Sequence, residues 1–163
     1  MEIRRATVAD WEVVREIRLH SLRDAPQAFC SVLEVEQKFD DQSWLDRITR
    51  SAIFLAWSGG KPVGTVAGTI DTHEEGSREF VGMWVDPVAR GAGVASVLID
   101  AVASWASTER AQSLALWVAD DNVGARRLYE KYGFALTGER EAMRPGVEQL
   151  RMRKPLAPSE DAT

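Results

Sequence analysis

The spacing of apolar residues changes repeatedly along the chain, and each change predicts a new structural element. Alternating or continuous apolar runs predict strands, whereas apolar residues three and four positions apart predict helices. Strands are therefore expected at Glu2–Ala6, Ala52–Trp57, Pro62–Asp71, Arg78–Val85, Ser113–Val118, Ala135–Met143 and Val147–Arg153. Helices are expected at Thr7–Arg23 and Ser31–Lys38, and from Asp40, Val94 and Asn122 onward. This order predicts a mixed α+β fold with helices on both sides of a central sheet of about seven strands.

The stretch from Val81 to Trp105 contains the clearest sign of a binding site. An apolar strand pattern ends at Asp86-Pro87, and a basic, glycine-bearing turn then leads into an amphipathic helix. The first N–H groups of a helix have no partner within it, and the helix dipole favours negative charge there. Gly91 and Gly93 allow the backbone to approach a phosphate closely, and Arg90 adds a permanent positive charge. This layout predicts an anion site.

Three kinds of phosphate loop compete for this turn. A Walker loop needs Gly-Lys-Ser/Thr at the start of the helix, where this chain has Ala92-Gly93-Val94. A dinucleotide-binding fingerprint would begin at Gly91, but Ser96 stands where its third glycine should be. The third pattern, Arg-x-x-Gly-x-Ala, is met by Arg90, Gly93 and Ala95. A plain turn without a ligand is the remaining alternative.

A second block runs from Asn122 to Phe134 and reads Asn-Val-Gly-Ala-Arg-Arg-Leu-Tyr-Glu-Lys-Tyr-Gly-Phe. Helical spacing places four of its residues on one face: Ala125, Leu128, Tyr129 and Tyr132. Gly133 can end the helix in the left-handed conformation. In this order, the two blocks resemble the pyrophosphate loop and the Asn-x-x-Ala-x-x-x-Tyr-x-x-x-Gly-Phe segment of the GNAT superfamily of acyl-CoA-dependent N-acyltransferases. The resemblance covers about Ile3 to Leu156.

The resemblance to GNAT proteins implies a three-layer fold with a mostly antiparallel sheet, and it implies acetyl-CoA as the acyl donor. The phosphates would bind mainly to backbone N–H groups of Arg90, Gly91, Ala92, Gly93, Val94, Ala95 and Ser96. The pantetheine arm would pair with the backbone of Met83, Trp84 and Val85. The Asn122 side chain would contact the cofactor, and Ala125 would be the small residue beneath the arm. Asn122 is equally suited to cap the helix that follows, and both roles can hold at once.

Acyl transfer also requires proton transfer, for which the chain offers two leading candidates. The resemblance implies that Tyr129 is the general acid that protonates the departing thiolate. The alternative for Tyr129 is a core tyrosine whose hydroxyl meets a backbone carbonyl. An alkyl amine has a pKa of about 10.4, so it must lose a proton before it can attack. Glu79 is the candidate base, because a carboxylate at the start of the fourth strand serves this role in many GNAT proteins.

The residue pattern also supports Glu79 as the base, because strand alternation places its side chain on the same face as Val81, Met83 and Val85. The alternative is a surface charge that Arg78 balances. Glu34 or Asp40 could serve as the base instead, and some GNAT proteins rely on solvent alone. The segment Leu22 to Trp44 resembles the acceptor side of bacterial GNAT proteins. Its acids could attract an amine or simply form a solvated helix face: Glu34, Glu36, Asp40 and Asp41.

Composition limits the function classes further. The 163 residues suit one domain, expected at residues 1–156, with a flexible tail at 157–163. A formal net charge of −5 argues against a nucleic-acid-binding protein. The single cysteine, Cys30, excludes an intrachain disulfide and fits a cytoplasmic location. No apolar run reaches the length of a membrane span. His20 and His73 lie far from any acidic or cysteine cluster, so no metal site is expected.

The leading hypothesis is an acetyl-CoA-dependent N-acetyltransferase that acts on a primary amine of a small molecule or peptide, by direct transfer in a ternary complex. The rivals are a non-catalytic acyl-CoA-binding or sensing module and a nucleotide-binding oxidoreductase domain. The presence of both Asn122 and Tyr129 argues against the first rival, and the incomplete fingerprint argues against the second. The sequence does not identify the acceptor. Homodimers are frequent in the GNAT superfamily, so a second copy is among the expected partners.

Overall fold

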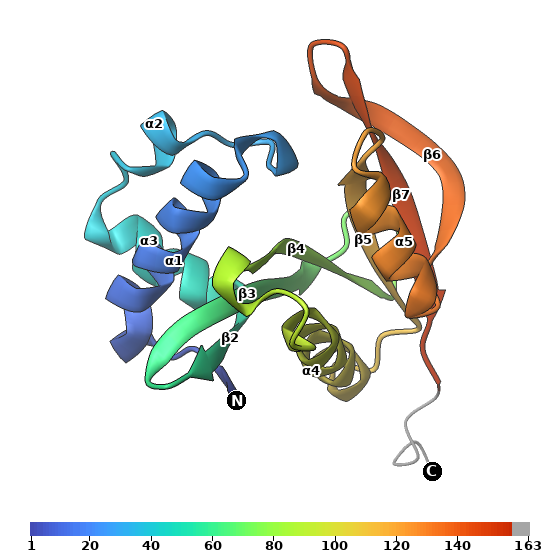
Figure 1. Ribbon diagram of the computed structural model, residues 1–163. Coiled ribbons are helices and arrows are strands. Elements are labelled where there is room, and N and C mark those ends of the chain that lie inside the picture. Colours follow the sequence, from blue (N-terminus) through green and yellow to red (C-terminus); the bar gives the residue numbers. More distant parts are fainter. Residues whose placement is uncertain (158–163) are drawn as a thin grey trace. The chain divides into compact units, whose positions relative to one another are not determined.

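The computed structural model describes residues 1–157, so almost all of the predicted tail at 157–163 lies outside the described residues. Its strands are β1 (Glu2–Arg5), β2 (Ala52–Ser58), β3 (Lys61–Ile70), β4 (Ser77–Val85), β5 (Ser113–Ala119), β6 (Ala135–Arg144) and β7 (Val147–Pro155) (Figure 1). Its helices are α1 (Trp11–Asp24), α2 (Leu33–Glu36), α3 (Asp41–Arg50), α4 (Val94–Thr108) and α5 (Val123–Lys131). The predicted elements are all present, although α2 is much shorter than the predicted helix at Ser31–Lys38.

The strands form one seven-stranded sheet in the order β1-β2-β3-β4-β5-β7-β6. Antiparallel pairing joins β1 to β2, β2 to β3, β5 to β7 and β6 to β7, whereas β4 and β5 run parallel. The predicted α+β fold with a mostly antiparallel sheet is therefore confirmed. The chain divides into two compact units, one of Met1–Thr69 with Phe80–Trp105, the other of Ile70–Glu79 with the chain from Ala106 onward. Strand β4 begins in the second unit and ends in the first.

Side-chain hydrogen bonds at predicted caps precede two helices of the first unit, α1 and α3. The backbone N–H of Thr7 donates to the Asp10 carboxylate at 2.8 Å just before α1. At α3, the Asp40 carboxylate accepts from the backbone N–H of Ser43 at 2.9 Å. Each bond satisfies a backbone donor near a helix start that would otherwise lack a partner.

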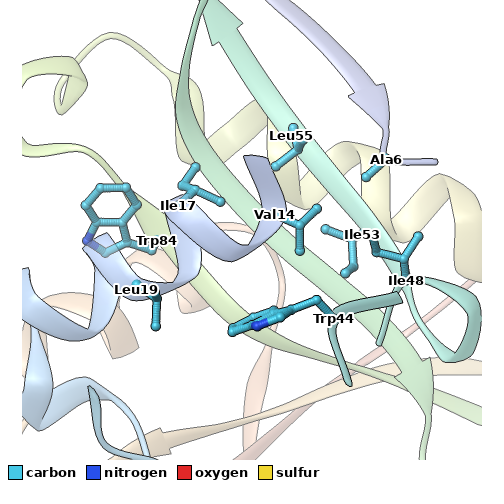
Figure 2. Packing of buried hydrophobic residues seen from close by; sticks show 9 residues of the cluster. All are labelled: Ala6, Val14, Ile17, Leu19, Trp44, Ile48, Ile53, Leu55 and Trp84. Atoms are coloured by element: carbon cyan, nitrogen blue, oxygen red, sulfur yellow. The ribbon is translucent and has the colours of Figure 1, made fainter. Parts of the chain in front are cut away.

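One face of β2 and β3 packs against α1 and α3. Figure 2 shows side chains from both helices turned toward Ile53 and Leu55 of β2. Trp44 of α3 and Leu55 are fully buried, at 0% exposure. The buried cluster consists of Ala6, Val14, Ile17, Leu19, Trp44, Ile48, Ile53, Leu55 and Trp84. Since buried apolar area is the main favourable term in folding, this cluster fixes the layer of α1 and α3 on the strands.

The opposite face of the same strands packs against α4. Ala52 pairs with Gly68 and Ala56 with Gly64, so both glycines lie on the face away from Ile53. A Cβ atom on Gly64 would lie 2.9 Å from the Val94 side chain, and one on Gly68 would lie 2.4 Å from the Trp105 ring. The two missing side chains thus allow α4 to lie close to β3.

The second unit contains a buried strand and a buried ion pair. β5 is buried along its length apart from the half-buried Trp117, as its apolar sequence predicts. The guanidinium of Arg151 on β7 bonds to the carboxylate of Asp71, and their side chains are 1% and 0% exposed. Burial opposes the ionisation of Asp71, but the hydrogen bonds from Arg151 and from the His73 N–H outweigh it, so the pKa of Asp71 falls below its usual value. This pair therefore stabilises the unit above the ordinary pKa of an aspartate, and the stabilisation is lost as the pH falls through the lowered value.

The close approach of α4 to β3 can be tested with Gly68→Ala. The added methyl group would overlap the Trp105 ring, and we expect the free energy of unfolding to fall by about 1–3 kcal/mol. The control is Gly124→Ala in α5, where no atom lies within 4 Å of the added carbon. Its free energy of unfolding should stay unchanged or rise by up to ~1 kcal/mol, because alanine favours helix. Equal losses in the two variants, measured by urea denaturation, would contradict the packing described.

Candidate active site

The turn before α4 has the geometry of an anion site. Gly91 and Gly93 adopt φ values of 83° and 82°, in the left-handed region that favours glycine. No atom lies within 4 Å of the place that a Cβ would take on either residue, so the turn is open. The first turn of the 15-residue helix α4 contains no acidic side chain. Its leading N–H groups have no partner within the helix, so the turn fits a diphosphate.

Arg90 is anchored to its own unit. Its Nη2 donates to the Asp24 carboxylate at 2.7 Å, and its Nε donates to the Val85 carbonyl at 3.0 Å. The same Asp24 oxygen accepts from Trp84 Nε1 at 2.9 Å. The hydrogen bond from Trp84 contributes most to lowering the pKa of Asp24 below its usual value. The hydrogen bond from Arg90 and the positive charge of Arg90 lower this pKa further. The expected free positive charge of Arg90 is thus partly balanced, and the side chain also ties the turn to the end of β4.

Asp24 is the residue of this arrangement that the sequence did not reveal. It is the last residue of α1, and its partners Trp84 and Arg90 lie 60 and 66 positions away along the chain. Local patterns report only neighbours a few residues apart, so the sequence shows Asp24 as no more than part of a helix end.

The backbone proposed to hold the acyl arm follows an irregularity in β4. Gly82 has a φ of 65°, which is not an extended conformation. The buried residues nearest to it are Phe80 and Trp84, at 3% and 4% exposure, whereas Val81 is 45% exposed. Strict alternation cannot be carried across Gly82 because a left-handed residue turns the chain. Alternation still relates Glu79 to Val81, but it cannot be carried across Gly82 to Met83 and Val85, so the shared face stays a prediction.

In the second unit, Asn122 and Ala125 lie at the start of α5. The Asn122 side-chain oxygen accepts from the backbone N–H of Ala125 at 3.2 Å, so Asn122 is the N-cap of α5. The alternative of a capping role for Asn122 is thus confirmed, and its amide NH2 group is not used by that bond. Ala125 is half-buried. A contact of either residue with a cofactor stays a prediction.

Tyr129 lies on the buried face of α5. It is 7% exposed, and its ring meets that of Phe134 edge-on at 6.2 Å. Leu128 and Tyr132 on the same face are half-buried, and Gly133 ends the helix with a φ of 93°. Burial raises the pKa of the Tyr129 phenol well above its ordinary value. The phenol therefore stays protonated at neutral pH, which a general acid requires.

Glu79 is half-buried in the second unit, opposite Ala115 in the parallel pair of β4 and β5. Burial, followed by the negative charge of Asp71, raises the pKa of its carboxyl above the usual value. Arg78 pairs with Glu109 at 3.7 Å, so no ion pair between Arg78 and Glu79 is formed. The alternative in which Arg78 balances Glu79 is therefore wrong.

The other acids considered as bases or amine attractors have different surroundings. Glu36 is 1% exposed and bonds to Arg18 and Arg47, so it belongs neither to a solvated helix face nor to a free acidic patch. Asp40 caps α3, and hydrogen bonds from the side chain and backbone of Ser43 lower its pKa, which makes it a weaker base. Glu34 and Asp41 are exposed on the surface.

Searches of the described residues for other kinds of site gave two findings. Among residues 1–157, no three or more His, Cys, Asp and Glu side chains are grouped so that they could hold a metal ion. Within the same part of the chain, every helix is too short or too polar to reach across a bilayer.

The predicted site residues thus fall into two sets. The first unit holds the turn from Arg90 to Ser96 together with the backbone of Met83, Trp84 and Val85. The second unit holds Glu79, Asn122, Ala125 and Tyr129. Within each unit, side-chain contacts, helix caps or burial hold these residues in place.

Comparison with known proteins identifies the family. The profile of the acetyltransferase (GNAT) family matches residues 16–134, which include both sequence blocks. The chain belongs to the GNAT family. This GNAT protein is 33% identical over 156 residues to the L-amino acid N-acetyltransferase AaaT of Escherichia coli K12, covering 88% of this chain and 90% of the relative.

Solved structures agree with this GNAT fold. The acetyltransferase yncA of Salmonella typhimurium, solved with its cofactor acetyl-CoA, superposes with a TM-score of 0.78 at 18% identity and covers 100% of this chain and 99% of its own. The ribosomal-protein-alanine N-acetyltransferase of Brucella melitensis gives a TM-score of 0.74 at 21% identity, covering 96% and 100%. The predicted superfamily and three-layer fold are therefore confirmed, and this GNAT protein is an acetyltransferase.

The role of the turn can be tested with Gly93→Ala against Gly146→Ala. Both glycines have a positive φ and open surroundings, so each substitution should cost about 1–2 kcal/mol of stability through backbone strain. Gly146 lies in the hairpin between β6 and β7, away from the turn in sequence. We expect only Gly93→Ala to weaken coenzyme A binding, by about tenfold or more in calorimetry. An unchanged dissociation constant for Gly93→Ala would remove the turn from the binding site.

Proposed function

We propose that this protein transfers the acetyl group of acetyl-CoA to a primary amine of a small molecule or peptide, by direct attack in a ternary complex. The observation that carries the proposal is the open, acid-free turn at the head of α4, which fits a diphosphate. Membership of the GNAT family and the Asn122–Phe134 block support it.

The donor contacts that the GNAT resemblance implies are proposed for the residues of each unit by itself. Backbone N–H groups hold the phosphates at Arg90, Gly91, Ala92, Gly93, Val94, Ala95 and Ser96. The backbone of Met83, Trp84 and Val85 pairs with the pantetheine arm, and Asn122 and Ala125 contact the donor from α5. The positive charge of Arg90 adds to phosphate binding only in part, since Asp24 balances it at 2.7 Å.

The proposed chemistry is a single acyl transfer. The lone pair of the amine nitrogen attacks the thioester carbonyl carbon, the new C–N bond forms, and the C–S bond breaks. Over the whole reaction one proton passes from nitrogen to sulfur, and the products are an N-acetyl amine and coenzyme A. The reaction needs no redox partner, but it needs a base on the amine side and an acid on the thiolate side.

Glu79 is proposed as the base, acting through water. Burial raises the pKa of the Glu79 carboxyl, and a carboxylate with a raised pKa takes up a proton more readily than an ordinary one. Tyr129 is proposed as the acid, because burial keeps its phenol protonated at neutral pH, so that the O–H can donate a hydrogen bond or a proton to the departing thiolate. Neither role depends on a covalent enzyme intermediate.

The main rival is a module that binds acyl-CoA without catalysis. A thiol-release assay with acetyl-CoA and a panel of amines separates the two: steady release with at least one amine supports the enzyme, and binding of acetyl-CoA without release from any amine supports the rival. The name of the Escherichia coli relative places amino acids in that panel, beside polyamines and peptides. A cytoplasmic location and a homodimer stay predictions.

The acid role is tested by Tyr129→Phe, with Tyr132→Phe as the matched control on the same helix face. Loss of the Tyr129 hydroxyl should lower kcat by about tenfold to a hundredfold, because the thiolate leaves unprotonated, while coenzyme A affinity changes little. The Tyr132 variant should keep kcat within about twofold. Steady-state kinetics with the best amine of the panel gives both numbers. Unchanged turnover in Tyr129→Phe would assign that ring to packing alone.

The base role is tested by Glu79→Gln through the pH–rate profile. Wild-type kcat/KM should rise with pH as Glu79 ionises through its raised pKa, and the variant should lose that part of the rise. A raised folded-state pKa also means that ionised Glu79 destabilises the fold as the pH rises above its ordinary pKa. The variant should therefore be at least as stable as wild type at pH 7. An identical pH–rate profile in both proteins would exclude Glu79 as the base.

A further inference from the structure

A buried carboxylate in the first unit joins its three N-terminal helices. Glu36 of α2 is 1% exposed, and its two oxygens accept from Arg18 Nε at 3.0 Å and Arg18 Nη2 at 2.9 Å. Arg47 of α3 donates to the same carboxylate through Nη1 at 2.9 Å. Such a two-pronged bond fixes the plane of the Arg18 guanidinium on α1.

The cluster of Arg18, Glu36 and Arg47 has a net positive charge. Two guanidinium groups face one carboxylate, so a net positive charge remains at a site where only 19% of the Arg18 side chain is exposed. A guanidinium has five N–H donors. Within residues 1–157, Nη1 of Arg18 has no hydrogen-bond acceptor, because both bonds of this side chain go from Nε and Nη2 to Glu36. A partly buried cation with unused donors favours the binding of an anion.

The unused donors of Arg18 lie against β4. Nη1 is 3.5 Å from the position that a Cβ would take on Gly82, the residue with the irregular backbone. Met83, Trp84 and Val85, the proposed backbone partners of the acyl arm, follow directly along the strand. The Phe29 ring supports the guanidinium from one side, with the Arg18 Cζ 4.8 Å from the ring centroid. The guanidinium is therefore fixed in direction, and its Nη1 lies beside the strand whose backbone is proposed to pair with the acyl arm.

We infer that Arg18 Nη1 binds the carboxylate of the acceptor, and that the acceptor is a free α-amino acid. The inference rests on the proposed function. In a free amino acid the carboxylate and the amine are attached to the same carbon, so a carboxylate held beside Gly82 keeps the amine close to the following strand residues. A peptide N-terminus has a neutral amide at that place, and a polyamine has no anion. Glu36 and Phe29 are positioning residues that act through Arg18.

Arg47 offers a matched comparison. It bonds to the same carboxylate as Arg18, but its loss removes one hydrogen bond to Glu36 whereas the loss of Arg18 removes two. Its guanidinium lies over the Trp44 ring at 4.8 Å and over the Phe39 ring at 5.9 Å. These contacts of the Arg47 guanidinium are with α2, α3 and the loop between them, whereas the Arg18 guanidinium lies beside β4.

The experiment compares kcat/KM for an L-amino acid, its carboxamide and its decarboxylated amine, using thiol release from acetyl-CoA. Wild type should prefer the amino acid over both analogues by about tenfold or more, as the loss of a charge-assisted hydrogen bond predicts. Arg18→Gln should reduce that ratio to near unity, mainly through the KM of the amino acid. Arg18→Lys should keep part of the ratio because it keeps the charge, and Arg47→Gln should keep all of it within about twofold.

Equal kcat/KM for the amino acid and its two analogues in wild type would overturn the inference and leave the proposed function intact. The same holds if Arg18→Gln keeps the wild-type ratio, or if Arg47→Gln loses it equally. Absence of thiol release with every amine would instead contradict the proposed function itself. If Arg18→Gln fails to fold, Arg18→Lys and the wild-type comparison of the amino acid with its carboxamide still decide the matter.

Discussion

The N–H groups at the head of α4 that have no partner within the helix are the feature on which the account depends. An unpaired backbone donor is costly when it is buried, so such groups must face solvent or a ligand. The first unit keeps them open in two ways. Gly91 and Gly93 bring no side chain into the turn, and Arg90 ties the turn to Asp24 at the end of α1 and to Val85 at the end of β4. The glycines of β3 add to this by letting α4 lie close to the sheet.

The second unit contains a buried ion pair that stabilises the unit and an acidic residue, Glu79, that destabilises the unit when it is ionised. Asp71 and Arg151 are both buried, and each satisfies the other. Among residues 1–157, Glu79 of the same unit forms no such ion pair, and burial together with the Asp71 charge disfavours its ionised form. A protein under selection for stability alone has no use for an acid in this place, whereas a catalyst needs a carboxylate that accepts protons readily. Burial has a different effect on Tyr129, whose phenol stays neutral and keeps an O–H that can donate to the thiolate.

The sequence predicted what depends on local spacing. The apolar periods located all strands and helices, and the caps at Thr7 and Asp40 are visible as short-range patterns. Asn122 was recognised as a cap for the same reason. The family was recognised because its two motifs are short and contiguous, and the family profile confirms it.

The sequence could not predict features whose partners are far apart along the chain or whose backbone departs from regular geometry. Arg18 and Glu36 look like two exposed charges until the fold brings their side chains to 2.9 Å. Asp24 is similar, since its partners are on β4 and in the turn beyond it. Gly82 is a case of irregular backbone, because alternation assumes an extended chain and the φ of 65° at Gly82 is not extended.

The most direct test of the central claim follows the backbone amides of the folded protein during titration with coenzyme A. In 15N-labelled protein, the account expects the N–H resonances from Gly91 to Ser96 to shift most strongly and to saturate with the dissociation constant found by calorimetry. Pantetheine, which lacks the diphosphate, should leave those resonances near their starting positions and bind at least about a hundredfold more weakly. If coenzyme A and pantetheine bound equally well, or if the amides of the turn did not move, the diphosphate would not bind at the head of α4.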